Sequence, residues 1–182
     1  MGRQLSKLSK RTNSSTLCRL PTMVPILLIL TFLAALGAGL VAGFFLAFSA
    51  TVMWALERQP SPAGIAAMQT INVVVLNPIF LGVFFGTAIL SLVLDIVALV
   101  RWLEPGSGYL LAGSLLYFVG TFLVTLVFNV PLNNRLAAVN PDSTEGKAVW
   151  THYLRVWTAW NHVRTVAPLA AAACFILAIA QQ

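Results

Sequence analysis

The sequence predicts an all-α protein, a bundle of four transmembrane helices that run up, down, up and down. Two observations lead to this fold class. Apolar residues make up 59% of the 182 residues and charged residues only 9%, whereas soluble globular proteins contain roughly 45–50% and about 25%. In addition, four apolar stretches each come near or exceed the roughly 18 residues that mark a membrane-spanning candidate.

A backbone exposed to lipid must satisfy its own hydrogen bonds, so each apolar stretch is expected to be a helix. The predicted spans are Val24–Ala50, Ile79–Val100, Tyr109–Val130 and Val163–Ala180. The first span follows a basic segment, as a signal peptide would. Its apolar run is about twice the usual length of a signal-peptide core, however, and we expect it to be retained.

The connections between the spans differ in length. Arg101–Gly108 is a short turn rich in proline and glycine, which break helices. Of the two longer connections, one begins a helix at Ser61-Pro62 and the other turns at Asn140–Gly146 before a further helical segment. Helices two, three and four are therefore expected to extend beyond the bilayer on the side of these longer loops.

Residues 1–22 form a basic segment that we separate from the membrane domain, residues 23–182. Five of the eleven Lys and Arg residues lie in the first nineteen positions, with no acidic residue among them. Such a tail is expected to be disordered and to stay cytoplasmic beside anionic lipid, which places both termini inside. If translation starts at Met23 instead, this bias disappears and the predicted orientation inverts.

Charge and cysteine usage exclude several classes of protein. The net charge of +6 is not arranged as a patch on a polar domain, so no nucleic acid is expected as a partner. Cys18 lies in the polar tail and Cys174 deep in the last span, so a disulfide is not expected. No glycine-rich phosphate loop or nucleophile elbow is visible. Membrane lipid is the expected partner, and a homo-oligomer is left open.

Polar and aromatic residues gather where helices one and three end and where helices two and four begin. In an up-and-down bundle all four places lie at the same end. A pocket lined by Trp and Phe with convergent polar groups suits a planar aromatic or quinone-like ligand. The predicted ligand-binding residues are Asn129, Asn133, Asn77, Trp160, Trp157, Trp54 and Glu57.

Residue spacing supports this interpretation for the set. Asn129 and Asn133 are four positions apart and therefore share a helix face. Trp157, Asn161 and Arg164 follow the same helical spacing. Taken singly, each residue has an ordinary structural role, because Trp and Arg are enriched at membrane interfaces and Asn caps helices.

The chemistry available to this cluster is acid–base rather than metal chemistry. The pKa of histidine is ordinarily near neutrality, so His162 can act as a general base. Arg164 and Asn161 can then stabilise an enolate-like anion. His152, His162 and Glu57 are too sparse to predict a metal site, although a metal at His162 is left open.

Three segments carry a family resemblance: "GVFFGTAIL", "LVTLVFNVPLNNRLAAVNPDS" and "VWTHYLRVWTAWNHVRTVAPLAAAACFILAI". They resemble the anthrone oxygenase-like family of small four-helix membrane proteins, most of them bacterial. The motifs "FNVPLN" and "WNHVR" are its most specific part. In this sequence the two motifs contain Asn129, Asn133, Asn161, His162 and Arg164, which the resemblance marks as site residues.

The resemblance implies an activity and a location. Fungal proteins similar to this family oxidise anthrones to anthraquinones with molecular oxygen and without a bound metal or flavin. The implied function is a membrane-embedded oxygenase for anthrone-like or quinol-like aromatic molecules, with molecular oxygen as co-substrate and no organic cofactor. The implied location is the bacterial inner membrane. The alternative is a non-enzymatic membrane protein that binds a small hydrophobic molecule or serves as an assembly partner.

Overall fold

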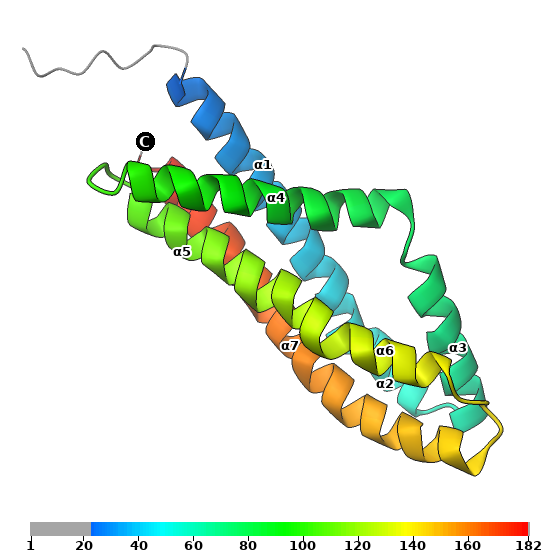
Figure 1. Ribbon diagram of the computed structural model, residues 1–182. Helices are drawn as coiled ribbons and strands as arrows, with labels where there is room; N and C mark the ends of the chain where they lie inside the picture. The colour runs from blue at the N-terminus through cyan, green and yellow to red at the C-terminus, as the bar shows by residue number, and fades with distance from the viewer. Residues whose placement is uncertain (1–22, 182) are drawn as a thin grey trace, which may run out of the picture.

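The structure, a computed structural model, describes residues 23–181. This part of the chain is all-α and contains no strand, and the prediction of an all-helical protein is confirmed. Successive long rods run in opposite directions in the ribbon (Figure 1). The predicted basic tail, residues 1–22, lies outside the described residues.

Four helical rods are joined by short connections, and two of the rods change from α- to π-helical geometry along their length. The elements are α1 (Met23–Ala47), η1 (Phe48–Val52), α2 (Met53–Glu57), α3 (Ser61–Val74), α4 (Pro78–Val100), α5 (Ser107–Tyr117), η2 (Phe118–Leu123), η3 (Thr125–Asn129), α6 (Val130–Ala137) and α7 (Thr144–Ile179). The segments η1, η2 and η3 are π-helical. The first, third and fourth rods are longer than the predicted apolar stretches; α7, for example, begins nineteen residues before the predicted Val163. The second rod, α4, exceeds its predicted span by one residue only, and the helical segment before it is the separate helix α3.

Local sequence signals explain where the rods begin and end. The Asn77 side chain accepts hydrogen bonds from the backbone N–H groups of Ile79 and Phe80, and Pro78 occupies the first helical position. Ser143 caps α7 in the same way, through the N–H of Gly146. Both arrangements satisfy backbone donors that the first turn of a helix leaves unpaired.

Four rods in the described part of the chain are long and apolar enough to cross a membrane: Pro25–Glu57, Pro78–Val100, Ser107–Ala137 and Thr144–Ile179. Large apolar side chains are exposed on all four, for example Leu36, Ile89, Leu115 and Ile176. A soluble monomer rarely exposes so extensive an apolar surface. The chain is therefore an integral membrane protein whose outer surface faces lipid.

The interior divides into two apolar clusters. One consists largely of small and aromatic residues of α1, α4, α5 and α7, including Ala34, Ala38, Leu94, Tyr117 and Phe175. The other lies toward the α2–α3 end and contains Met53, Ile65, Met68, Trp150 and Tyr153. Small side chains let the rods of the first cluster approach closely, which is the usual basis of helix packing in membranes.

Gly37 provides a test of this close packing. A Cβ at this position would lie 2.0 Å from Thr87 Oγ1 on α4, whereas a Cβ at Gly39 would meet nothing within 4 Å. We predict that Gly37→Ala destabilises the protein by about 1–3 kcal/mol through overpacking. Gly39→Ala, the matched control on the same helix, should be neutral or slightly stabilising. Thermal unfolding in detergent measures both, and equal melting temperatures would contradict the packing.

Candidate functional site

The side chain of Arg164 lies in the interior of the bundle, on α7, and is only 4% exposed. Its Nη2 donates to Asn161 Oδ1 at 2.9 Å, and its Nη1 donates to Thr125 Oγ1 at 3.4 Å. The guanidinium carbon lies 4.2 Å from the ring centre of Phe45 and 5.0 Å from that of Trp157. Aromatic faces attract a cation, so these rings offset part of its desolvation cost.

Asn161 anchors this arrangement to the first rod. Its Nδ2 donates to Phe45 O at 2.9 Å and to Ser49 Oγ at 2.8 Å. Ser49 is also hydrogen-bonded to Thr165, and Thr165 donates to Asn161 O. Arg164 can only donate hydrogen bonds, so Asn161 Oδ1 must face it, and this fixes the orientation of the amide. One asparagine thus joins α7 to the first rod and holds the guanidinium.

Two of the π-helical segments, η1 and η3, lie at the same level as these contacts. Ser49 belongs to η1, and Thr125 and Asn129 belong to η3. A π-helical turn accommodates an extra residue and changes the direction of the side chains around it, and such turns are frequent at functional sites. Here each segment directs polar groups of an otherwise apolar rod toward α7.

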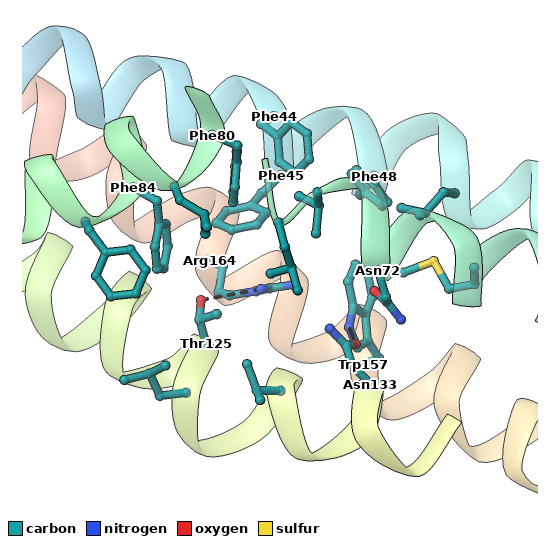
Figure 2. Close-up of a pocket in the computed structure, with 18 residues that line it drawn as sticks. Phe44, Phe45, Phe48, Asn72, Phe80, Phe84, Thr125, Asn133, Trp157 and Arg164 are labelled. Carbon is teal, nitrogen blue, oxygen red and sulfur yellow. Dashed lines mark hydrogen bonds between the residues drawn. The ribbon is translucent and has the colours of Figure 1, made fainter. Parts of the chain in front are cut away.

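A cavity of about 240 Å³ lies beside Arg164 and is walled mainly by apolar side chains. Figure 2 shows several phenylalanines along it, with Arg164 and Thr125 in one part and Asn72, Asn133 and Trp157 in another. The lining residues come from every rod of the bundle. The aromatic ones are Phe44, Phe45, Phe48, Phe80, Phe84, Phe85 and Trp157.

Asn133 on α6 is held by two donors from α7. The hydroxyl of Tyr153 and the indole Nε1 of Trp157 both donate to its Oδ1, at 2.8 and 2.7 Å. An indole N–H is only a donor, so the amide oxygen of Asn133 must face Trp157. One turn earlier, Asn129 donates to Trp157 O at 3.2 Å and is fully buried. Both Asn side chains therefore connect the third rod to α7.

The lining also reaches the outer surface of the bundle. Leu76, Phe85 and Leu126 are 63%, 44% and 43% exposed. α4 contacts α5 and η2, but its contact with η3 and α6 is marginal at most. The cavity therefore opens sideways, between the first half of α4 and the η3–α6 part of the third rod, onto the surface that faces lipid.

The structure brings five of the predicted site residues together. Asn133, Trp157 and Arg164 line the cavity. Asn129 and Asn161 are fully buried behind it, where they hold Trp157 and Arg164 in place.

The structure does not bring His162 to this group. Its side chain is exposed and is not part of the cavity wall. The reason is helical geometry, since each residue turns about 100° around the axis. Asn161 and Arg164, three apart, point inward together, and His162 between them points away. His162 therefore does not lie where a general base for a ligand in this cavity would have to lie.

Four of the predicted ligand-binding residues also lie away from the cavity wall. Trp160 stacks on Phe128, with ring centres 3.7 Å apart and planes 9° apart. Trp54 is 57% exposed, and Glu57 is exposed at the end of α2. Asn77 is exposed and caps α4 instead. All four residues lie at the same end of the bundle as the cavity, but none of them lines it.

Several residues of the site were not predicted from sequence. Ser49 and Thr125 are single hydroxyl residues in apolar spans, a pattern too common to single out. The phenylalanines carry a signal, because Phe44 and Phe48, like Phe80 and Phe84, are four apart and share a helix face. Asn72 is among the polar residues that precede the second span, but its position alone does not distinguish a ligand-binding residue from a structural one.

Within the residues that the structure describes, no group of three His, Cys, Asp or Glu side chains lies close enough to hold a metal ion. The polar groups at the cavity are instead a guanidinium, amides and hydroxyls. This set is suited to binding oxygen atoms of an organic ligand through hydrogen bonds.

The relationship of the chain to known proteins agrees with this arrangement. A family model described as anthrone oxygenase matches residues 79–174, more than half of the chain. The chain belongs to the anthrone oxygenase family. No curated protein and no solved structure matches it at a significant level. The family segment contains Thr125, Asn133, Trp157 and Arg164, whereas the cavity walls from α1, η1 and α3 lie outside it.

We predict that Asn161→Leu lowers the free energy of unfolding by about 2 kcal/mol or more, because it leaves several buried polar groups unpaired. For a chain of this size that corresponds to roughly 4–8 °C in melting temperature. His162→Leu is the matched control on the neighbouring, outward-facing position. Thermal unfolding in detergent compares the two, and a larger loss for the His162 variant would contradict the network.

Proposed function

We propose that the protein is a membrane-embedded oxygenase that binds a planar aromatic molecule with an ionisable oxygen, such as an anthrone or quinol, and directs that oxygen toward Arg164. One observation carries the proposal. Arg164 is buried beside an aromatic cavity and has no acidic partner among the described residues. The ion pair that the described residues do contain, between Arg101 and Glu104, lies in the turn after α4.

A buried guanidinium without a counter-ion is energetically costly. Ionisable residues within membrane proteins usually face the interior, pair with another group and mark functional paths. Arg164 uses only two of its five N–H donors, on the neutral partners Asn161 and Thr125, and its Nε is unpartnered. The ligand best suited to complete this set is an anionic oxygen, which would form short, charge-assisted hydrogen bonds.

The shape and polarity of the cavity support an aromatic ligand. Phenylalanine faces and edges surround the space, and aromatic rings prefer stacked or edge-to-face contacts with one another. A cavity of about 240 Å³ is small beside the roughly 300–1,000 Å³ of most ligand sites. It therefore favours a compact, flat molecule over a lipid. The sideways opening lets such a molecule enter from the membrane, where it is concentrated.

The chemistry of an anthrone follows from charge stabilisation at one atom. Loss of a ring-methylene proton gives an enolate, whose oxygen Arg164 stabilises in an apolar site where electrostatic interactions are strong. The electron-rich ring carbon transfers electrons to molecular oxygen and forms a carbon–oxygen bond. The resulting hydroperoxide loses water and leaves a carbonyl group. In sum, one anthrone and one O₂ give one anthraquinone and one water.

The cavity wall contains no carboxylate, histidine or lysine side chain in the described part of the chain. We therefore propose that the proton passes to water, and that Arg164 promotes its loss by favouring the bound anion. Asn161 and Thr125 act as positioning residues that hold the guanidinium. The second candidate function, binding of an aromatic weak acid without turnover, is favoured by the same lack of a base. It predicts binding without oxygen consumption.

We also infer the location of the site. The basic segment at positions 3–19 favours cytoplasmic termini in a bacterial inner membrane. With that orientation the cavity, which lies toward the α2–α3 end, belongs to the outer leaflet half of the bundle.

The first test replaces Arg164. Arg164→Met keeps the length of the side chain but removes its charge and donors. We predict a loss of on the order of 10–100-fold in affinity for an ionisable anthrone, the range expected for hydrogen bonds to a charged group. Wild-type binding should tighten as pH rises through the ligand's own pKa, and this dependence should disappear in the variant. Arg155→Met, on the exposed face of the same helix, is the control.

Binding to the detergent-solubilised protein is measured together with oxygen consumption and anthraquinone formation. Binding that is lost with Arg164→Met and turnover that is absent in the wild type would favour the non-enzymatic alternative. Unchanged binding in Arg164→Met would refute the proposal.

The second test concerns His162. Because its side chain points away from the cavity, we predict that His162→Ala keeps more than half of the wild-type oxygen-dependent turnover of an anthrone. The measurement is the initial rate of oxygen uptake at saturating substrate. A fall of 100-fold or more, the order of magnitude of general-base catalysis, would instead assign the base role to His162.

A further inference from the structure

We propose that the cavity has a second polar subsite, formed by Asn72 and Asn133, which binds another oxygen at the end of the ligand remote from Arg164. The subsite would make the protein selective for aromatic molecules that carry a second oxygen function remote from the ionisable one. The inference rests on the proposed function, since Arg164 must hold the first oxygen.

The two polar ends are separated along the bundle. Trp157, which donates to Asn133, is seven residues before Arg164 on α7, a rise of about 10 Å. On the third rod Thr125, which accepts from Arg164, is eight residues before Asn133, about two helical turns. Figure 2 shows the pair Arg164 and Thr125 apart from the group Asn72, Asn133 and Trp157. The guanidinium reaches back toward this group, with its carbon 5.0 Å from the Trp157 ring centre, so the Trp157 side chain lies between the two polar ends.

The amide nitrogen of Asn133 is available to a ligand. Its Oδ1 already accepts from Tyr153 and from Trp157, and the donor-only indole fixes that orientation. Nδ2, which carries two N–H groups, must then point away from these two donors. Because Asn133 lines the cavity, its N–H groups can reach a ligand there. The stacked rings of Trp150, Tyr153 and Trp157 hold the two donors, and therefore the amide, in place.

Asn72 contributes a second amide from the opposite wall. It lies on α3 and lines the same cavity. Its Nδ2 is buried and has no hydrogen-bond partner in the described part of the chain. Although the Tyr153 hydroxyl lies near it, that oxygen could take at most one of its two N–H groups. A buried unpaired donor is costly, and a ligand oxygen would satisfy it.

The walls between the two ends carry no comparable group. Apart from Asn72, Thr125, Asn133, Trp157 and Arg164, the lining is apolar, for example Phe44, Phe80 and Val130. A ligand oxygen placed midway would therefore lose its hydrogen bonds to water without replacement. The arrangement selects for molecules with one ionisable oxygen at Arg164, an apolar ring system, and an acceptor oxygen at the amides.

The test compares two ligands on the full-length protein in detergent. The probes are 2-hydroxyanthracene and 2,6-dihydroxyanthracene, which have no oxygen on the middle ring, share a ring system and differ in a hydroxyl at the far end of the long axis. We expect the wild type to bind the dihydroxy compound about tenfold more tightly, the effect of one to two hydrogen bonds. Asn72→Leu should reduce this preference to less than about threefold while leaving the affinity for the monohydroxy compound nearly unchanged.

Asn134→Leu is the matched control, since Asn134 is an exposed asparagine beside Asn133 on α6. It should keep the full preference. Asn72→Gln, which retains the amide, should recover part of the preference and separates loss of the amide from disturbed folding. Melting temperatures of all variants are compared with the wild type.

The outcomes separate this inference from the proposed function. Equal binding of both probes by the wild type, with affinity that still depends on Arg164, would overturn the second subsite alone. An unchanged preference in Asn72→Leu would also overturn it. If neither probe binds the wild type, both the subsite and the proposed function fail.

Discussion

The interaction on which the site depends is the solvation of the Arg164 guanidinium by neutral groups. This charge lies in an apolar interior and has no acidic partner among the described residues. A charge in such surroundings is stable only if neutral groups solvate it. Here the amide oxygen of Asn161, the hydroxyl of Thr125 and the rings of Phe45 and Trp157 do so. These groups come from three of the four rods. The position of one charged side chain therefore links the first, third and fourth rods to one another.

The two halves of the bundle differ in how closely their helices pack. Toward the α4–α5 turn, alanine and glycine allow close helix contact, and Gly37 meets Thr87 with no room for a methyl group. Toward the α2–α3 end, bulky aromatic residues and α3 keep the rods apart, and the cavity lies between them. The cavity thus lies in the half where the helices pack less closely.

Only part of the cavity wall lies within the segment that matches the anthrone oxygenase family. The family segment includes the residues around Arg164, but α3, with Asn72, lies outside it. A reaction that depends on stabilising one developing anion would need only the first group. The choice among aromatic substrates can then be made by walls that lie outside that segment. Under the proposed function, this division would let related bundles keep one chemistry while the recognised molecule changes.

The sequence by itself determined the all-helical class, the four membrane-spanning rods and the end of the bundle at which polar residues gather. Apolar composition and segment length leave no other solution for a chain in lipid, because every backbone hydrogen bond must be made locally. The i, i+3 and i, i+4 spacings also placed Asn129 with Asn133 and Asn161 with Arg164, since helical periodicity is a local property.

The tertiary structure decided which of those polar residues face a common space. His162 is adjacent to Asn161 in sequence, yet it points outward, and Trp54, Glu57 and Trp160 likewise lie away from the cavity. The rotation of each rod depends on packing against its neighbours and on three π-helical segments, which shift the helical phase in ways that residue spacing does not reveal. The cavity itself exists only where rods diverge, and Asn72 joins it from a distant part of the chain. Such long-range contacts depend on the packing of the whole bundle and have no local signature.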